Sequence, residues 1–99
     1  MAIAEISVVP LGTETPSVSQ YVARAIKVLE HEKDIKYEMT AMGTIVEGDL
    51  DRILAMVKKM HEGIFEGGVA RVITTVHIDD RRDKVQGMRE KLDSLKKKL

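Results

Sequence analysis

Polar side chains interrupt the first apolar segment of the chain, AIAEISVVPLGTETPSVS, which spans residues 2–19. Its alternation is typical of a strand, and it places Glu5 and Ser7 on one face. The opposite face is apolar and consists of Ala4, Ile6 and Val8. A carboxylate and a hydroxyl beside a threonine-rich turn form a small polar site on an apolar wall. Such a site suits the binding of a small molecule with ring and amine character better than it suits most catalysis.

Two acids, Glu5 and Glu47, are expected inside strands. Either carboxylate can accept a hydrogen bond from an exocyclic amine or pair with a cationic ligand. The simpler interpretation is an ordinary strand acid that faces solvent. Two carboxylates can also perform acid–base catalysis, but the sequence places no nucleophile beside a base.

The three histidines lack the spacing of a metal site such as HExxH. His61 follows Val57 by four residues and precedes Ile64 by three, so it lies on the apolar stripe of a helix. A histidine in that position is more often a hydrogen-bonded core residue than a ligand or a base. The chain contains no cysteine, which excludes disulfides, thiolate catalysis and cysteine-ligated zinc. We therefore expect neither a metal site nor a cofactor.

Hydroxyl and thioether groups gather around two turns. Thr13 lies in a turn before a helix N-terminus, where free backbone N–H groups favour an anion, but the segment lacks the lysine of a phosphate-binding loop. Around the second turn, Met42 offers a thioether wall, Gly43 allows close backbone approach, and Thr44 supplies a hydroxyl. The alternative interpretation of Gly43 is a simple β-bulge.

The elements that must position these residues follow the order strand, helix, strand, strand, helix, strand, helix. After the first helix, residues 35–42 alternate as a strand, residues 45–47 continue as a short one, and residues 71–78 are rich in β-branched side chains. Two strand–helix–strand units with a central strand pair predict a ferredoxin-like α/β (α+β) sandwich. We expect residues 1–99 to form this single domain, a four-stranded antiparallel sheet with two helices on one face and a C-terminal helix added.

Local signals predict where the helices begin and end. Ser17 and Gln20 form a capping box for the first helix, and Asp49 or Asp51 can cap the second. Two glycines, at positions 67 and 68, are expected to end the second helix. The apolar stripe of the second helix is expected to consist of Leu50, Ile53, Leu54, Val57, Ile64 and Phe65.

The predicted sheet leaves one face uncovered, and the last helix carries a narrow apolar seam. The seam residues recur at helical spacing and are Val85, Met88, Leu92, Leu95 and Leu99. This seam can dock on its own domain or pack along a partner subunit. An open face and a seam together favour a homo-oligomer, with a tetramer expected. The charged block at residues 79–84 is predicted to be a solvated turn with internal ion pairs, and intersubunit salt bridges are the alternative.

Composition excludes several classes of function. Sixteen basic and sixteen acidic residues balance, which argues against a nucleic-acid binder or an acidic-membrane binder. RNA binding by base stacking is disfavoured because the aromatic residues are limited to Tyr21, Tyr37 and Phe65. The segment MAIAEISVVPLG has no basic stretch, so no secretory signal is expected, and no apolar run approaches the roughly 20 residues that span a bilayer. With the absence of cysteine, these observations predict a cytoplasmic protein.

Three blocks of the sequence resemble a known family. They are AEISVVPLGTETPSVSQYVARAI, AMGTIVEGDLDRIL and HEGIFEGGVARVITTVHIDDRRDK, and the similarity runs in order from Ala2 to Lys84. The family is that of the small thiamine-binding proteins. The resemblance implies a ferredoxin-like fold, a cytosolic location, tetramers built as dimers of dimers, and binding of thiamine or hydroxymethylpyrimidine with no established catalytic activity. The matching positions are Thr13, Ser19, Tyr21, Gly43, Thr44, Glu47, His61 and Thr74.

The preferred hypothesis is therefore a non-enzymatic binder of thiamine or a related pyrimidine. Its aminopyrimidine requires an acid or a carbonyl, and its thiazolium cation tolerates an aromatic or thioether wall. At a site near a subunit boundary, we expect ligand contacts from Thr13, Tyr21, Met42, Thr44, Glu47 and His61. One alternative is a small enzyme that uses Glu47 and His61 as an acid–base pair, and another is a ligand-sensing regulatory subunit with a protein client.

Overall fold

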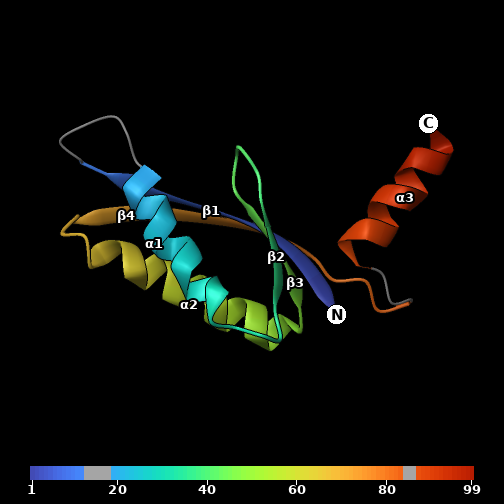
Figure 1. Ribbon diagram of the computed structural model, residues 1–99, viewed down its shortest axis with the longest axis horizontal. Helices are drawn as coiled ribbons and strands as arrows, with labels where there is room; N and C mark the ends of the chain where they lie inside the picture. Colours follow the sequence, from blue (N-terminus) through green and yellow to red (C-terminus); the bar gives the residue numbers. More distant parts are fainter. Residues whose placement is uncertain (13–18, 84–86) are drawn as a thin grey trace.

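Four strands form one antiparallel sheet in the computed structural model, which describes residues 1–12, 19–83 and 87–99 (Figure 1). The strands are β1 (Ala2–Leu11), β2 (Lys36–Met39), β3 (Thr44–Gly48) and β4 (Arg71–Asp79). The helices are α1 (Ser19–Glu30), α2 (Leu50–Phe65) and α3 (Met88–Lys98). Across the sheet the strands lie in the order β2-β3-β1-β4. The predicted ferredoxin-like α+β fold, with its additional C-terminal helix, is confirmed.

One face of the sheet is covered by α1 and α2. Alternate side chains of β1 are buried there, as the sequence pattern predicts, and they are Ala2, Ala4, Ile6 and Val8. They join the buried residues of α1 and α2 in one hydrophobic core. The other residues of β1 point to the open face, because successive side chains of a strand point to opposite sides.

The buried stripe of α2 differs from the predicted one. Its buried residues are Ile53, Met56, Met60 and Ile64. Leu54 and Phe65, both expected in the stripe, are exposed, so the prediction is wrong at these positions. The observed positions share one helix face, and flexible methionine side chains fill the space that faces the sheet. Asp49 occupies the N-cap position without a side-chain cap hydrogen bond, and Ser17 of the predicted capping box lies outside the described residues.

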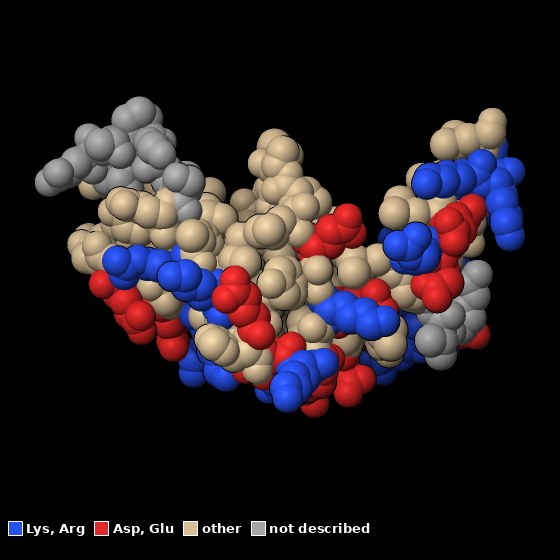
Figure 2. All heavy atoms as spheres, in the orientation of Figure 1, with Lys and Arg blue, Asp and Glu red and all other residues tan. Residues whose placement is uncertain are grey.

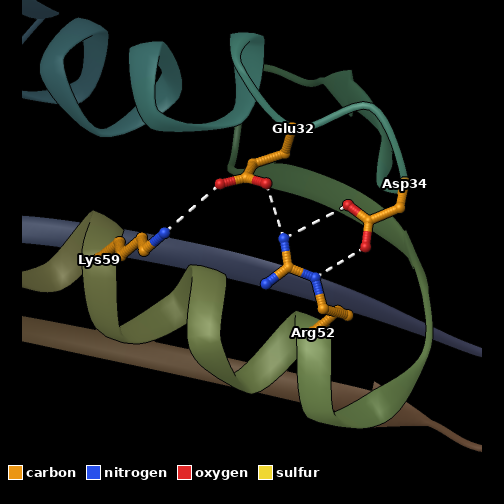
Figure 3. Close-up of polar contacts among 4 residues, drawn as sticks. All are labelled: Glu32, Asp34, Arg52 and Lys59. Carbon is orange, nitrogen blue, oxygen red and sulfur yellow. Dashed lines mark hydrogen bonds and ion pairs between the residues drawn. The ribbon is translucent and has the colours of Figure 1, made fainter.

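An ion-pair cluster joins the connection between α1 and β2 to the outer side of α2 (Figure 3). Arg52 Nη2 lies 2.6 Å from Glu32 Oε2, and Arg52 Nε lies 2.7 Å from Asp34 Oδ2. Lys59 Nζ lies 3.4 Å from the second carboxylate oxygen of Glu32. The hydrogen bond from the Arg52 guanidinium lowers the pKa of Asp34. The cluster therefore fixes the start of β2 against α2 on the helix-covered side.

α3 stands apart from the other two helices (Figure 1). It has no buried residue, and the seam residues Leu92 and Leu95 are exposed, whereas Val85 lies outside the described residues. Lys91 forms an ion pair with Asp79 at the end of β4. In the single chain the apolar seam is thus only partly covered.

The charged segment after β4 pairs internally. Arg81 Nε lies 2.6 Å from Asp83 Oδ1, and Arg82 Nη2 lies 2.9 Å from Asp80 Oδ2. The prediction of internal ion pairs is confirmed for these four residues, while Lys84 lies outside the described part of the chain. Among the described residues, no helix is long and apolar enough to span a membrane.

Candidate functional site

The turn between β2 and β3 is fixed by the side chain of Thr40. Its hydroxyl donates to the Gly43 carbonyl at 2.8 Å and accepts backbone N–H groups from Gly43 at 3.1 Å and Met42 at 3.3 Å. The Thr40 backbone N–H also donates to the Gly43 carbonyl at 2.8 Å. One donated and two accepted bonds use the full capacity of a hydroxyl. The turn is therefore rigidly closed, with the exposed Met42 at its tip.

Gly43 brings this turn directly against β1. A Cβ atom at this position would lie 2.8 Å from the carbonyl oxygen of Ile6, closer than real Cβ atoms approach a backbone oxygen. Glycine permits this contact because it has no Cβ. The geometry supports close backbone approach as the role of Gly43, which was one of the two interpretations of the sequence.

A cavity of about 460 Å³ lies beside this turn, between α1, β1 and β3. We call it the turn pocket. Apolar residues of α1 form one wall, and the thioether side chains of Met39, Met42 and Met60 line the cavity. Its volume falls within the roughly 300–1,000 Å³ of small-molecule sites. The structure thus brings Met42 and Thr44, two of the predicted contact residues, into one cavity.

Thr44 is the buried polar residue of the turn pocket, with 4% of its surface exposed. Its side chain makes no hydrogen bond within the described residues. No side-chain nitrogen or oxygen in this part of the chain is both fully buried and without a partner. The Thr44 hydroxyl must therefore open into the cavity, where it can bind a polar group of a ligand.

Glu47 lies on the opposite face of the sheet from Thr44. Glu47 is three positions after Thr44 along β3, so strand alternation points their side chains in opposite directions. Within one chain, these two predicted contact residues therefore line different cavities. Glu47 is 9% exposed, and its Oε2 accepts the backbone N–H of Met88 at 3.2 Å. This carboxylate holds the N-terminus of α3, where the helix dipole also favours a negative charge.

His61 lies on the helix-covered side, between α2 and β4. Its Nδ1 is 2.7 Å from Thr74 Oγ1, and its ring meets Phe65 edge-on at a centroid distance of 5.3 Å. This environment matches the hydrogen-bonded core histidine that the sequence favours. Because the sheet separates His61 from Glu47, these two residues do not form the acid–base pair of the enzyme hypothesis.

Tyr21, another predicted contact residue, is not among the described residues that line the turn pocket. Tyr21 is half-buried on α1, and its ring carbon Cε1 would lie 2.8 Å from a Cβ atom at Gly67. Tyr21 thus packs against the segment that follows α2. Thr13 lies outside the described residues. Sequence reasoning missed Met39 and Met60, and their spacing on the covered faces of β2 and α2 is the signal that could have revealed them.

A second cavity, of about 520 Å³, lies on the open face of the sheet beneath α3. Figure 2 shows the hollow that separates α3 from the rest of the molecule. Its floor includes Ile3 and Ile45, and Leu92 and Leu95 of α3 border it. This cleft is more apolar than the turn pocket.

Comparison with known proteins assigns the chain to a family. The sequence pattern of the thiamine-binding protein family matches residues 4–96. The chain belongs to this family. The UPF0045 protein YqgV of Bacillus subtilis is 47% identical over 102 residues, covering 100% of this chain and 98% of that protein. A UPF0045 protein of Methanothermobacter thermautotrophicus is 45% identical over 100 residues and covers 100% of both chains.

Solved structures agree with this assignment. The hypothetical protein MJ1052 of Methanocaldococcus jannaschii has a TM-score of 0.88 at 42% identity, covering 96% of this chain and 95% of that chain. A candidate thiamine biosynthesis/salvage protein from Thermotoga maritima has a TM-score of 0.78 at 26% identity, covering 95% and 97%. This chain thus shares its fold with these two proteins.

Proposed function

We propose that this protein is a cytoplasmic homo-oligomer that binds thiamine or a related pyrimidine, and that the ligand occupies the turn pocket. Membership of the thiamine-binding family supports a small-molecule ligand. The observation that carries the choice of site is the Thr44 hydroxyl, which is buried, lacks a hydrogen-bond partner among the described residues and opens into a cavity of suitable volume.

The lining of the turn pocket suits a heteroaromatic ring. Met39, Met42 and Met60 offer polarizable thioethers, which make favourable contacts with aromatic rings. Thr44 supplies a hydroxyl that can donate to a ring nitrogen or accept from an amine. A flat ring with few polar atoms can therefore bury its faces against the methionine sulfurs, while the polar atoms at its edge form hydrogen bonds with fixed groups of the protein.

Binding without catalysis follows from the same lining. The described residues that line the turn pocket include no aspartate, glutamate, histidine, lysine or cysteine. A general acid or base must lie within hydrogen-bond reach of the proton that it moves. In the described part of the chain, Glu47 and His61 are held by Met88 and Thr74, outside this cavity.

Thr44→Val tests the site, because valine keeps the shape of the side chain and removes its hydroxyl. We expect the affinity for hydroxymethylpyrimidine or thiamine, measured by isothermal titration calorimetry, to fall by about 0.5–1.5 kcal/mol. The same change should leave the free energy of unfolding of the ligand-free protein nearly unchanged, since no described residue forms a hydrogen bond with the hydroxyl that is removed.

Thr75→Val is the matched control for this experiment. Thr75 carries the same side chain on the open face of β4, opposite Ser7, so its replacement should leave the affinity unchanged. The absence of binding heat with both ligands would contradict the proposed function. Equal affinity in wild type and Thr44→Val would move the site elsewhere.

The homo-oligomer, a tetramer built as a dimer of dimers, is supported by the apolar surface that the single chain leaves uncovered. Val9 and Ile73 are 41% and 45% exposed on the open face, and Leu92 and Leu95 of the α3 seam are also exposed. Monomeric proteins rarely expose contiguous apolar surface of this kind. Symmetric self-association buries it economically.

Replacing both Leu92 and Leu95 by Asp should dissociate the assembly while leaving the domain folded, because α3 contributes no buried residue to it. Sedimentation velocity gives the mass, and circular dichroism checks the fold. Leu54→Asp is the control, since Leu54 is exposed on α2, away from the open face. A wild-type mass of 11.1 kDa at micromolar concentration would refute the assembly.

A further inference from the structure

β1 extends beyond the end of β3. The first residue of β3, Thr44, lies opposite Ile6, and the pairing of β1 with β4 continues as far as Leu11. On the β3 side, residues 7–11 therefore face no strand in the described part of the chain. Ser7, Val8 and Val9 of this unpaired edge line the turn pocket.

The contact at Gly43 shows which peptide groups point to the unpaired edge. A Cβ atom at Gly43 would lie 2.8 Å from the Ile6 carbonyl oxygen, so this carbonyl points towards β3. In an antiparallel sheet, the N–H and C=O of one residue point to the same side, and consecutive residues point to opposite sides. Val8 therefore directs both its N–H and its C=O to the unpaired edge.

Pro10 agrees with this assignment and restricts what can bind there. Pro10 lies two residues after Val8 and four after Ile6, so its backbone points to the same side of β1 as theirs. Because proline has no N–H, Pro10 cannot form a hydrogen-bonded pair with Val72 of β4. Proline on an edge also blocks the addition of another strand. Within the unpaired half of β1, one N–H is thus directed to this edge, that of Val8. One donor with its adjacent acceptor suits a small molecule better than a strand.

The geometry points to Val8 as the backbone recognition site for an aminopyrimidine in the turn pocket. Its N–H donates to a ring nitrogen, and its C=O accepts from the amino group on the neighbouring ring carbon. This inference rests on the proposed function and adds to it a recognition mode and a ligand class. The class comprises heteroaromatic rings in which an acceptor nitrogen adjoins an exocyclic amine.

The remaining contacts of such a ring follow from its position. With its edge at Val8, the ring lies among the methionine side chains of the pocket, and Thr44 is left to bind a polar substituent. Because the Val8 carbonyl accepts the amino group of the ligand, the pocket can select an amine without a carboxylate side chain. The donor and acceptor are held by the pairing of β1 with β4, so they are fixed before the ligand arrives.

The test replaces the peptide group and keeps the side chain. A chain of 99 residues is accessible to chemical synthesis and ligation, so Val8 can be exchanged for the hydroxy acid with the same side chain. This exchange removes the N–H. We expect the affinity for hydroxymethylpyrimidine to fall roughly 3- to 10-fold, with unchanged stability, because no strand uses this N–H.

The same exchange at Leu11, which does not line the turn pocket, is the control. The Leu11 N–H points towards β4, where Leu11 lies opposite Arg71, so its loss should lower the stability of the fold and leave the affinity unchanged. Val8→Pro removes the same N–H by ordinary mutagenesis. Pro10, two residues further along, shows that β1 accommodates proline where the backbone points to the unpaired edge. It should reproduce the loss of affinity.

A change in the ligand tests the acceptor. The analogue of hydroxymethylpyrimidine with hydrogen in place of the amino group should bind the wild-type protein roughly 3- to 10-fold more weakly. If hydroxymethylpyrimidine binds and neither the hydroxy-acid exchange at Val8 nor the loss of the amine changes the affinity, the Val8 inference is overturned and the proposed function stands. If neither thiamine nor hydroxymethylpyrimidine binds, both are overturned.

Discussion

The two faces of the sheet are formed by the same four strands and differ in what covers them. On the helix-covered face, Ile6 of β1 is 1% exposed and packs against α1 and α2. On the open face, the neighbouring Glu5 lies opposite His77, with 3.7 Å between Oε1 and Nδ1, and Val9 and Ile73 remain exposed. The covered face forms the hydrophobic core, whereas the open face leaves apolar and charged groups exposed in the single chain.

The turn pocket lies at the margin of the sheet face that α1 and α2 cover. α1 supplies one wall, and the far wall is the edge of β1 beyond the first residue of β3. The position of the pocket combines apolar surface from the core with backbone groups that the sheet leaves unpaired. A ligand site here requires few specialised side chains, and Thr44 is the clearest of them.

The largest effect is expected from a core substitution that contrasts the two faces. Ile6→Ala should lower the free energy of unfolding by about 2–5 kcal/mol, because it opens a cavity in the covered core. Ile73→Ala makes the same chemical change on the open face, where the side chain is exposed, and should cost less than about 1 kcal/mol in a single chain. Urea unfolding measures both.

Repeating the unfolding measurements on Ile6→Ala and Ile73→Ala at several protein concentrations tests whether a partner subunit covers the open face. At high protein concentration, a cost for Ile73→Ala that approaches that of Ile6→Ala would mean that a partner subunit covers the open face. Equal costs under conditions where the protein is a monomer would contradict the difference between the faces.

A smaller effect is expected at the contact between the open face and α3. Glu47→Gln removes the charge that interacts with the N-terminus of α3 and should destabilise its attachment by about 1–2 kcal/mol. Hydrogen exchange of the α3 amides measures this loosening. Affinity for the pyrimidine should not change, because Glu47 lies across the sheet from the turn pocket.

Glu38→Gln serves as the control for Glu47. It makes the same change on the open face at an exposed residue of β2, whereas the Met88 N–H donates to Glu47. Loss of pyrimidine affinity in Glu47→Gln, with Glu38→Gln unaffected, would return Glu47 to the ligand site as the sequence suggests.

The smallest effect is expected at the ion-pair cluster around Arg52 and depends on pH. Because the folded chain lowers the pKa of Asp34, the ionised carboxylate stabilises the fold above its ordinary pKa of about 4. This stabilisation is lost as the pH falls through the lowered pKa. Asp34→Asn should therefore reduce the loss of stability between about pH 5 and pH 2, as measured by urea midpoints.

A double-mutant cycle with Arg52→Gln isolates this pair. Once Arg52 is replaced, Asp34→Asn should have little further effect on the acid dependence. If the urea midpoint of Asp34→Asn falls with pH as steeply as that of the wild type, the exposed ion pair contributes nothing measurable to stability, which is common for surface ion pairs.

The order of the elements and the buried face of β1 could be predicted from the sequence, because both depend on local periodicity. The alternation of β3 could also have predicted that Thr44 and Glu47 lie on opposite faces of the sheet, although the predicted site combined them. The stripe of α2 was predicted less well. Helical spacing alone does not distinguish Met56 from Leu54, and the position of the sheet beneath the helix decides which is buried.

The sequence by itself determined the alternating faces, the strand–helix order and the glycine that the second turn requires, since each follows from interactions between residues close in the chain. Only the tertiary structure decided that Glu47 meets Met88, 41 residues away, and that His61 bonds to Thr74. It also decided that Val8 faces an unpaired edge, because this depends on where β3 begins opposite β1. Such contacts arise from strand register and helix docking, which no local pattern encodes.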